Sequence, residues 1–217
     1  MKQGRIVRVR YWQWIAFLML TQFIDKFEVR VTFAALLIGL LFWSERHNKQ
    51  YIKNIKRLAI QDELTGLYNY RYFLTRLQEE LSRAKRHEAP LLLLLIDVDK
   101  FKIFNDSFGH GAGNRALQKI ALILKDATRG EDIIARFGGD EFICVCPNTS
   151  LENGKKLAER LRRRVEQTIF VSESSELTVS IGLKEYHQEE TLEEFFVKTD
   201  EKLYRSKRNG RNQVYVA

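Results

Sequence analysis

The chain has 217 residues, of which 45% are hydrophobic and only two are proline, so a largely disordered protein is excluded. This length allows one packed domain and an additional segment. The net charge of +8 is compatible with nucleic-acid binding, but the basic residues are spread along the chain and accompany no nucleic-acid-binding motif. We therefore expect no nucleic-acid polymer among the partners.

Two apolar runs occupy the N-terminal part of the chain, at residues 11–24 and 31–43, with the polar segment DKFEVR between them. Basic residues precede the first run and follow the second, so the positive-inside rule places both outer ends on the cytoplasmic side. The pattern favours a membrane anchor of two short transmembrane helices within residues 1–43. There are two alternatives. Either only one run spans the membrane and the first lies at its interface, or both runs belong to the core of a soluble protein.

Residues 44–61 are polar and carry Tyr51, Ile55 and Leu58 at a spacing of four and then three. This spacing predicts a helix with a narrow apolar seam. The helix could serve as a dimeric stalk between the anchor and the following domain, or it could pack on its own domain.

Residues 62–217 have the pattern of one α+β domain. Amphipathic helices are expected at about 69–87 and 113–127, a basic helix at about 151–168 and a last helix at 192–208. Strands are expected at 91–99, on both sides of a Gly-Gly pair, at 177–183 and at 213–216. Hairpin-paired strands mixed with helices favour an α+β fold over a doubly wound sheet.

Carboxylates gather at the ends of two of these strands. The period of two places Asp97 and Asp99 on one face of the strand LLLLLIDVD, at its C-terminal end. The Gly-Gly turn in RFGGDEF predicts a hairpin with Asp140 and Glu141 just after its apex. If this hairpin lies beside the first strand, Asp97 and Asp140 can share a hard cation such as Mg²⁺. Taken alone, a solvated turn would explain the same residues.

Four motifs in order extend this interpretation: DELTGLYN, DVDKFKIFND with FGHGAGN, RFGGDEF, and DEKLYRSKRNGRN. Together they make residues 60–217 resemble the GGDEF-domain diguanylate cyclases, which condense two GTP molecules into cyclic di-GMP. The resemblance implies a palm-like fold with a central, mostly antiparallel sheet flanked by helices. It also implies a homodimer as the active form. Together with the N-terminal apolar runs, it predicts a bacterial inner membrane location with the catalytic domain in the cytoplasm.

The resemblance further implies roles for individual residues. Asp97, the Val98 carbonyl, Asp140 and Glu141 match the family's ligands for Mg²⁺ or Mn²⁺, and Glu141 is alternatively the base for the attacking hydroxyl. Asn105 and Asn114 match the guanine-binding positions, and Gly138 and Gly139 let the nucleotide approach the backbone. The residues that match triphosphate-binding positions are Lys102, Lys207 and Arg211.

A second site is implied by the segment RGED, residues 129–132. Arg129 and Asp132 match the family's RxxD inhibitory site, where the product binds away from the catalytic centre. Arg160 matches an additional arginine of that site by its position. A domain that had lost catalysis could still bind cyclic di-GMP there as a receptor, although Asp97, Asp140 and Glu141 are all present.

One residue departs from the family pattern, because Asn114 stands where an aspartate is usual. An aspartate accepts hydrogen bonds from both donors of the guanine edge, whereas an asparagine offers one acceptor and one donor. The sequence therefore predicts weaker base discrimination, with some cyclic GMP-AMP among the products.

Overall fold

The computed structural model describes residues 14–20, 27–172 and 176–216, without the side chains of residues 27, 28 and 52–58. The chain divides into two compact units, Met1–Lys56 and Arg57–Ala217.

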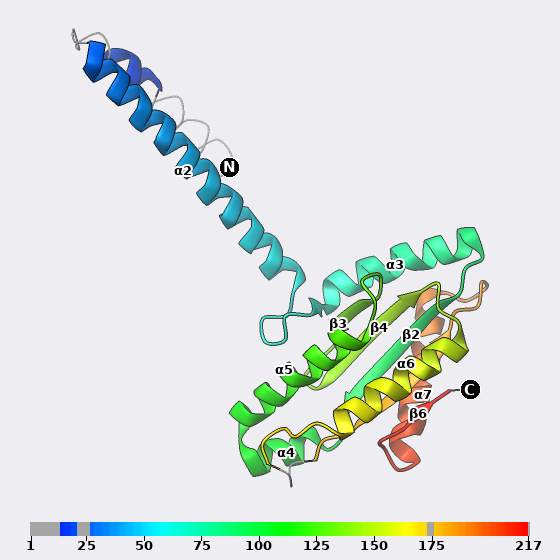
Figure 1. Ribbon diagram of the computed structural model, residues 1–217. Coiled ribbons are helices and arrows are strands. Elements are labelled where there is room, and N and C mark those ends of the chain that lie inside the picture. The colour runs from blue at the N-terminus through cyan, green and yellow to red at the C-terminus, as the bar shows by residue number, and fades with distance from the viewer. Residues whose placement is uncertain (1–13, 21–26, 173–175, 217) are drawn as a thin grey trace. The chain divides into compact units, whose positions relative to one another are not determined.

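A single helix dominates the first unit. Helix α2, Phe27–Ile60, runs without interruption through the second apolar run and the predicted stalk, as Figure 1 shows. None of the helices in the described part of the chain is long and apolar enough to cross a membrane. The physical reason within α2 is that its continuous apolar run, residues 31–43, is only about 20 Å long and has Arg30 and Glu45 close to its ends.

The predicted transmembrane hairpin is therefore not supported by the described residues. Most of the remaining N-terminal prediction lies outside them, at residues 1–13 and 21–26. The predicted stalk is helical. Of its seam, Tyr51 is exposed, whereas the side chains of Ile55 and Leu58 lie outside the described set.

The second unit is built on a six-stranded mixed sheet with the order β1-β3-β4-β2-β5-β6. The central pairs β3–β4, β4–β2 and β2–β5 are antiparallel, and the edge pairs β1–β3 and β5–β6 are parallel. The strands are β1 (Tyr68–Asn69), β2 (Leu91–Val98), β3 (Ile133–Arg136), β4 (Glu141–Pro147), β5 (Val179–Glu185) and β6 (Val214–Tyr215). The predicted α+β class is confirmed, and the short parallel edge strand β1 was not predicted.

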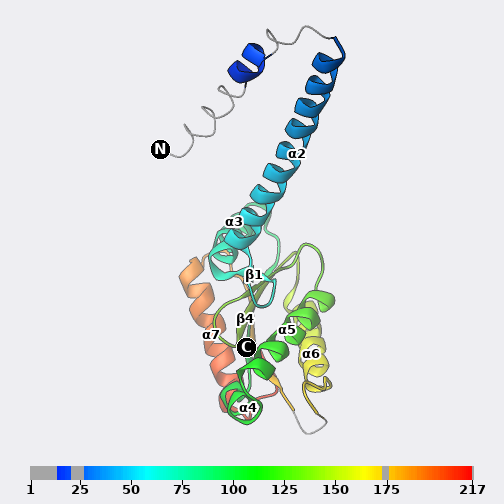
Figure 2. The same ribbon diagram turned by 90° about the vertical axis from the view of Figure 1, so that its left-hand side faces the viewer.

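Helices cover both faces of this sheet (Figures 1 and 2). Apolar side chains of α5 (His110–Ala127) and α6 (Leu151–Glu166) pack on one face, and those of α3 (Tyr70–His87) and α7 (Leu192–Arg208) pack on the other. Strand β2 is buried on both faces, because its alternate residues belong to the two different core clusters. All four predicted helices are present.

A fifth helix of the domain, α4 (Phe101–Phe108), was missed from the sequence. It has only eight residues and begins directly after β2, too short for a convincing periodic pattern. Its signal is the spacing of Phe101, Phe104 and Phe108, which are ring neighbours in the structure. This helix matters because it carries two of the predicted substrate-binding residues.

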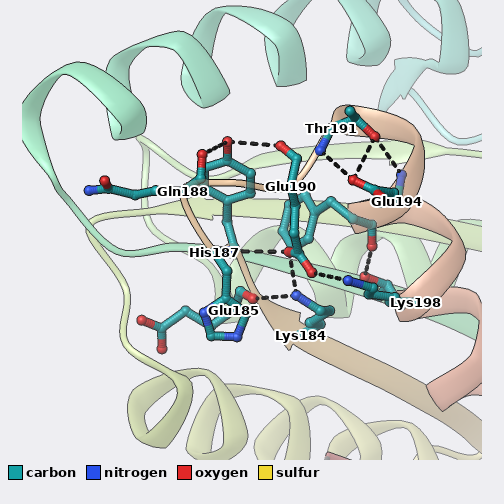
Figure 3. A network of polar contacts seen from close by, with 11 residues as sticks. Lys184, Glu185, His187, Gln188, Glu190, Thr191, Glu194 and Lys198 are labelled. Carbon is teal, nitrogen blue, oxygen red and sulfur yellow. Dashed lines mark hydrogen bonds and ion pairs between the residues drawn. The ribbon is translucent and has the colours of Figure 1, made fainter.

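The start of α7 is fixed by a network of polar contacts around Glu190, shown in Figure 3. The Glu190 carboxylate, 8% exposed, pairs with Lys184 on β5 and with Lys198 on α7 at 2.7 Å. Thr191 and Glu194 form a capping box at the first turn of the helix. These contacts hold α7 against β5, and α7 in turn presents Lys207 to the end of β2.

Candidate functional site

Two carboxylates face each other across neighbouring strands at one end of the sheet. Asp97 of β2 is the direct cross-strand partner of Glu141 of β4. Both continue the face on which Leu95 and Ile143 pack against α3 and α7. The predicted hairpin thus lies beside β2, and the carboxylate opposite Asp97 is that of Glu141. Like charges in such a pair destabilise a sheet, so the pair calls for a compensating cation.

That compensation comes from α7 in the described structure. The Lys207 Nζ atom lies 2.7 Å from Asp97 Oδ2, and the Asp97 side chain is only 13% exposed. Burial raises the pKa of Asp97 to about 6, and the carboxylates of Asp140 and Glu141 push it in the same direction while Lys207 opposes them. The site is therefore rich in negative charge, and it accepts a cation at the end of β2.

The hairpin tip has four loop residues, Phe137 to Asp140, between β3 and β4. Its amides at Phe137 and Gly138 donate to the Glu141 carbonyl, at 2.8 and 3.3 Å. Neither glycine has a left-handed φ, so the two-residue turn predicted from the Gly-Gly pair is replaced by a wider one. The lack of a side chain at Gly138 instead leaves room for the Glu141 carboxylate, because a Cβ at Gly138 would lie 3.1 Å from Glu141 Oε2. Gly139 is exposed at the apex.

The backbone of Asp140 connects this tip to the end of β2. Its carbonyl accepts a hydrogen bond from the Val98 amide at 3.2 Å, directly after Asp97. The predicted metal ligands Asp97, Val98, Asp140 and Glu141 therefore lie on adjacent backbone segments. In the described residues, however, no group of three or more potential ligand side chains is arranged to hold a metal ion.

Arg136 and Asp62, which were not predicted as site residues, form a set of contacts that supports the hairpin tip; we call this pair the brace. The Arg136 guanidinium donates to the carbonyls of Gly138 (3.1 Å) and Gly139 (2.7 Å). It also pairs with Asp62 at 3.2 Å, and Asp62 in turn accepts hydrogen bonds from Thr65. Arg136 and Asp62 stand at the start of two recognised motifs, which was the available signal.

The predicted base-binding residues lie on two consecutive helices, Asn105 on α4 and Asn114 on α5. The Asn105 Oδ1 atom is buried without a hydrogen-bond partner among the described atoms. It fits against Gly113, where a Cβ would come within 1.8 Å of it. Asn114 is the next residue on α5 and is exposed, as is Lys102 one turn before Asn105 on α4. The buried Asn105 oxygen therefore has hydrogen-bonding capacity that a bound base could use.

The predicted phosphate-binding cations are in different settings. Lys207 lies within α7, whereas that helix ends at Arg208 and Arg211 follows it in a loop. Arg211 is exposed and has a left-handed φ of 64°. It borders a groove of about 380 Å³ together with Lys100 and the buried Asp99.

The predicted inhibitory residues lie at the other end of α5. Arg129 is exposed, and its backbone amide donates to Asp132 Oδ2 at 2.8 Å. Burial raises the pKa of Asp132, and its carboxylate also interacts with the buried Cys146 thiol. Arg160 reaches from α6 to the Ala127 carbonyl at 2.7 Å, two residues before Arg129. The structure therefore brings all three residues to one surface.

The comparison with known proteins agrees with this geometry. Residues 59–213 match the family model described as diguanylate cyclase, GGDEF domain. The chain is 41% identical over 169 residues to the diguanylate cyclase DgcP of Pseudomonas aeruginosa, which covers 77% of this chain and 25% of that relative. It is 35% identical over 209 residues to diguanylate cyclase A of Treponema denticola, which covers 83% of this chain and 56% of the relative.

Solved structures give the same match. The coiled coil and GGDEF domain of DgcB from Caulobacter crescentus, in complex with c-di-GMP, aligns with a TM-score of 0.76 and 28% identity. That alignment covers 86% of this chain and all of the other. The diguanylate cyclase SiaD of Pseudomonas aeruginosa, in complex with its activator SiaC, aligns with a TM-score of 0.71 and 29% identity, over 100% of this chain and 84% of the other. This chain spans from a quarter to just over half of the curated relatives' length.

Proposed function

Since the chain belongs to the GGDEF-domain family of diguanylate cyclases, we propose that it condenses two molecules of GTP into cyclic di-GMP. In each half-reaction a 3′-hydroxyl attacks the α-phosphate of the facing nucleotide, a phosphodiester bond forms and pyrophosphate leaves. The observation that carries this proposal is the cross-strand pair of Asp97 and Glu141 with Lys207 beside it. Such a cluster of carboxylates with a cation beside it is typical of sites for phosphoryl transfer.

The donor set fits a hard divalent cation, although the described side chains are not arranged as a closed metal site. Carboxylates and a backbone carbonyl are the ligands that Mg²⁺ or Mn²⁺ prefers, and the Lys207 ammonium already stands in for a cation beside Asp97. The residues that would hold the ion are Asp97, Val98, Asp140 and Glu141. When bound, such an ion neutralises phosphate charge and lowers the pKa of the attacking hydroxyl.

The remaining work falls to residues of this chain. Lys207, Arg211 and Lys102 bind the triphosphate, which supplies three negative oxygen-rich groups for cationic side chains. Asn105 and Asn114 hold the guanine, and Gly138 keeps the hairpin tip open to the substrate. Glu141 accepts the proton of the attacking hydroxyl or coordinates the ion.

A homodimer is part of the proposal, because one domain binds one nucleotide and the reaction joins two. Holding the two substrates face to face removes most of the entropy cost of a bimolecular step. The long helix α2 is a suitable stalk for such pairing, and the related DgcB structure contains a coiled coil before its GGDEF domain.

We further propose that the product binds Arg129, Asp132 and Arg160 and inhibits synthesis. Support comes from their common surface, where Asp132 accepts from the Arg129 amide and Arg160 donates to the nearby Ala127 carbonyl. The related DgcB domain was solved with c-di-GMP.

The test is product formation by the full chain. Wild-type protein incubated with GTP and Mg²⁺ should yield a product with the mass of cyclic di-GMP, and Asp140→Ala should yield none. If wild-type protein makes no product but binds cyclic di-GMP tightly, the chain is a receptor and the proposed activity is wrong.

Relaxed base specificity is a second proposal for the same site, carried by Asn114. This residue follows Gly113, against which the Asn105 amide is packed, so both amides border one region. With equal GTP and ATP, wild type should form some cyclic GMP-AMP, and Asn114→Asp should shift the product toward cyclic di-GMP. Strict GTP use by the wild type would overturn this proposal.

Attachment to the bacterial inner membrane stays a prediction. It can be tested by fractionating cells that express the full chain, with recovery in the membrane pellet after a carbonate wash as the expected result. The catalytic proposal does not depend on that outcome.

A further inference from the structure

The loop between α7 and β6 has an unusual backbone. Arg211 and Asn212 have φ angles of 64° and 45°, in the left-handed region that residues with a side chain rarely adopt. Two such residues in succession persist only where contacts to the surroundings hold them. Hydrogen bonds of Asn212 with the neighbouring elements hold the backbone in this conformation.

The backbone of Asn212 is tied to the end of β2. Its amide donates to Asp99 Oδ2 at 3.0 Å. Asp99 is 5% exposed, and its carboxylate also accepts from the hydroxyls of Thr178 (2.7 Å) and Ser180 (2.6 Å). The carboxylate is therefore fixed by the sheet, and its charge-assisted hydrogen bond fixes the loop.

The side chain of Asn212 is tied to α6 at both ends of its amide. Its Oδ1 accepts from Arg162 Nη1 at 2.7 Å, and its Nδ2 donates to Glu166 Oε1 at 2.6 Å. Arg162 is itself held by Glu159 and Glu166, and its side chain is 14% exposed. The loop is thus anchored to two independent elements, β2 and α6.

The residue that this anchoring controls is Arg211. It lies directly before Asn212, its amide donates to the Ser206 carbonyl at 3.1 Å, and its side chain is exposed at the groove beside Lys100. An exposed arginine loses side-chain entropy when it binds a ligand, and a mobile backbone adds to that loss. A fixed backbone leaves only the side chain to be ordered.

We propose that Asn212 is a positioning residue that sets the backbone at Arg211 so that its guanidinium meets the outer phosphates of the nucleoside triphosphate. This inference rests on the proposed function, in which Arg211 binds the triphosphate. Asn212 lines the same groove, but both ends of its amide are engaged by Arg162 and Glu166, so in this proposal it acts through its neighbour. Its loss should weaken binding of a triphosphate and leave binding of a monophosphate unchanged.

The Asn212→Ala variant should still fold. Arg162 keeps its ion pairs with Glu159 and Glu166 at 3.1 and 3.0 Å, and the amide of residue 212 can still donate to Asp99. Asn209→Ala is the matched control, since Asn209 is an exposed asparagine at the end of the same helix.

The experiment measures the affinity of the full chain for the α,β-methylene analogue of GTP and for GMP, by calorimetry with Mg²⁺ present. Asn212→Ala should bind the triphosphate analogue about tenfold more weakly and GMP within twofold of wild type, and Asn209→Ala should match wild type for both. Arg211→Ala should show the same selective loss. The double variant should lose no more than either single variant, because both remove one interaction.

Any one of the following results would overturn the proposal. If Asn212→Ala weakens the binding of the triphosphate analogue and of GMP equally, Asn212 has a general structural role. If the fold-losses of affinity of the two single variants multiply in the double variant, Asn212 does not act through Arg211. A wild-type chain that binds neither nucleotide would overturn the proposed function and this inference with it, whereas wild-type binding without the selective loss overturns the inference alone.

Discussion

Lys207 Nζ lies 2.7 Å from Asp97 Oδ2, so an ammonium from α7 stands at the end of β2 where the proposed chemistry needs a cation. Without it, Asp97 would face Glu141 across the strands with Asp140 close by. One lysine cannot offset the burial and the two neighbouring charges, because the pKa of Asp97 is still raised to about 6. The ionised site is therefore a source of instability that a bound ligand would relieve.

The first prediction concerns Asp97→Asn in the presence of a chelator. Between about pH 4 and pH 6 native Asp97 keeps a proton that the unfolded chain has released, so the free energy of unfolding falls as the pH rises through this range. Asp97→Asn removes this penalty. The free energy of unfolding of Asp97→Asn, relative to that of the wild type, should increase by about 1–2 kcal/mol between pH 4 and pH 8, after allowance for solvent screening. Urea denaturation followed by circular dichroism at both pH values measures it.

Asp106→Asn is the matched control, because Asp106 is an exposed aspartate on α4. It removes an exposed carboxylate and leaves the contacts of Asp97 intact, so it should not reproduce the effect of Asp97→Asn. Adding Mg²⁺ at pH 8 should stabilise the wild type and not Asp97→Asn, by mass action on a folded-state site. A difference between wild type and Asp97→Asn that stays flat from pH 4 to pH 8 would contradict the prediction.

The second prediction concerns Gly113→Ala. The new Cβ would come within 1.8 Å of Asn105 Oδ1 and 3.1 Å of Phe101 Cζ, so the Asn105 side chain must leave its position. Binding of the α,β-methylene analogue of GTP should weaken by at least tenfold in calorimetry. Gly111→Ala is the control on the same helix, since its Cβ would meet only Arg115 Nη1, at an ordinary 3.7 Å. It should bind as wild type does; equal affinity of both variants would refute the steric argument.

The elements of the domain could be predicted because their patterns are long and regular. The apolar run of β2 and the helical periods of α3, α5, α6 and α7 placed each element within a few residues. Short α4 and two-residue β1 escaped because neither is long enough to repeat a pattern.

The candidate site was predictable as a set of motifs, but its contacts were not. The period of two placed Asp97 at a strand end, yet only the register of β2 against β4 pairs it with Glu141. The brace from Arg136 to Asp62 joins residues 74 positions apart, and the tie from Asn212 to Asp99 joins residues 113 apart. Such tertiary contacts leave no local pattern in a single sequence.

The third prediction concerns Arg136→Lys. The guanidinium fork serves two carbonyls of the hairpin tip and the Asp62 carboxylate at once, and a lysine ammonium cannot reproduce that geometry. Unfolding free energy should fall by about 1–2 kcal/mol, and amide hydrogen exchange at residues 137–140 should become faster. Turnover with GTP should drop tenfold or more, because the tip carries Asp140 and Glu141.

A milder change separates the two parts of this brace. Asp62→Asn removes the ion pair but leaves Arg136 bonded to the carbonyls of Gly138 and Gly139. Its effect on exchange at the tip should be smaller than that of Arg136→Lys. The reverse order would mean that the ion pair, and not the fork on the carbonyls, holds the tip.

The last prediction concerns Glu190, at the centre of the network in Figure 3. Burial alone would raise the pKa of Glu190, but hydrogen bonds from Lys184, Lys198 and the His187 amide lower it to about 2. Because the folded-state pKa is depressed, this carboxylate stabilises the fold above the unfolded value near 4.5, and the contribution is lost as the pH falls toward 2. Glu190→Gln should therefore lower the free energy of unfolding by about 2 kcal/mol at pH 7, and this difference from wild type should shrink in acid. Glu189→Gln, at an exposed neighbouring position, should unfold as the wild type does in urea at both pH values. If the two glutamine variants lost equal stability at pH 7, the network would not be what holds the start of α7.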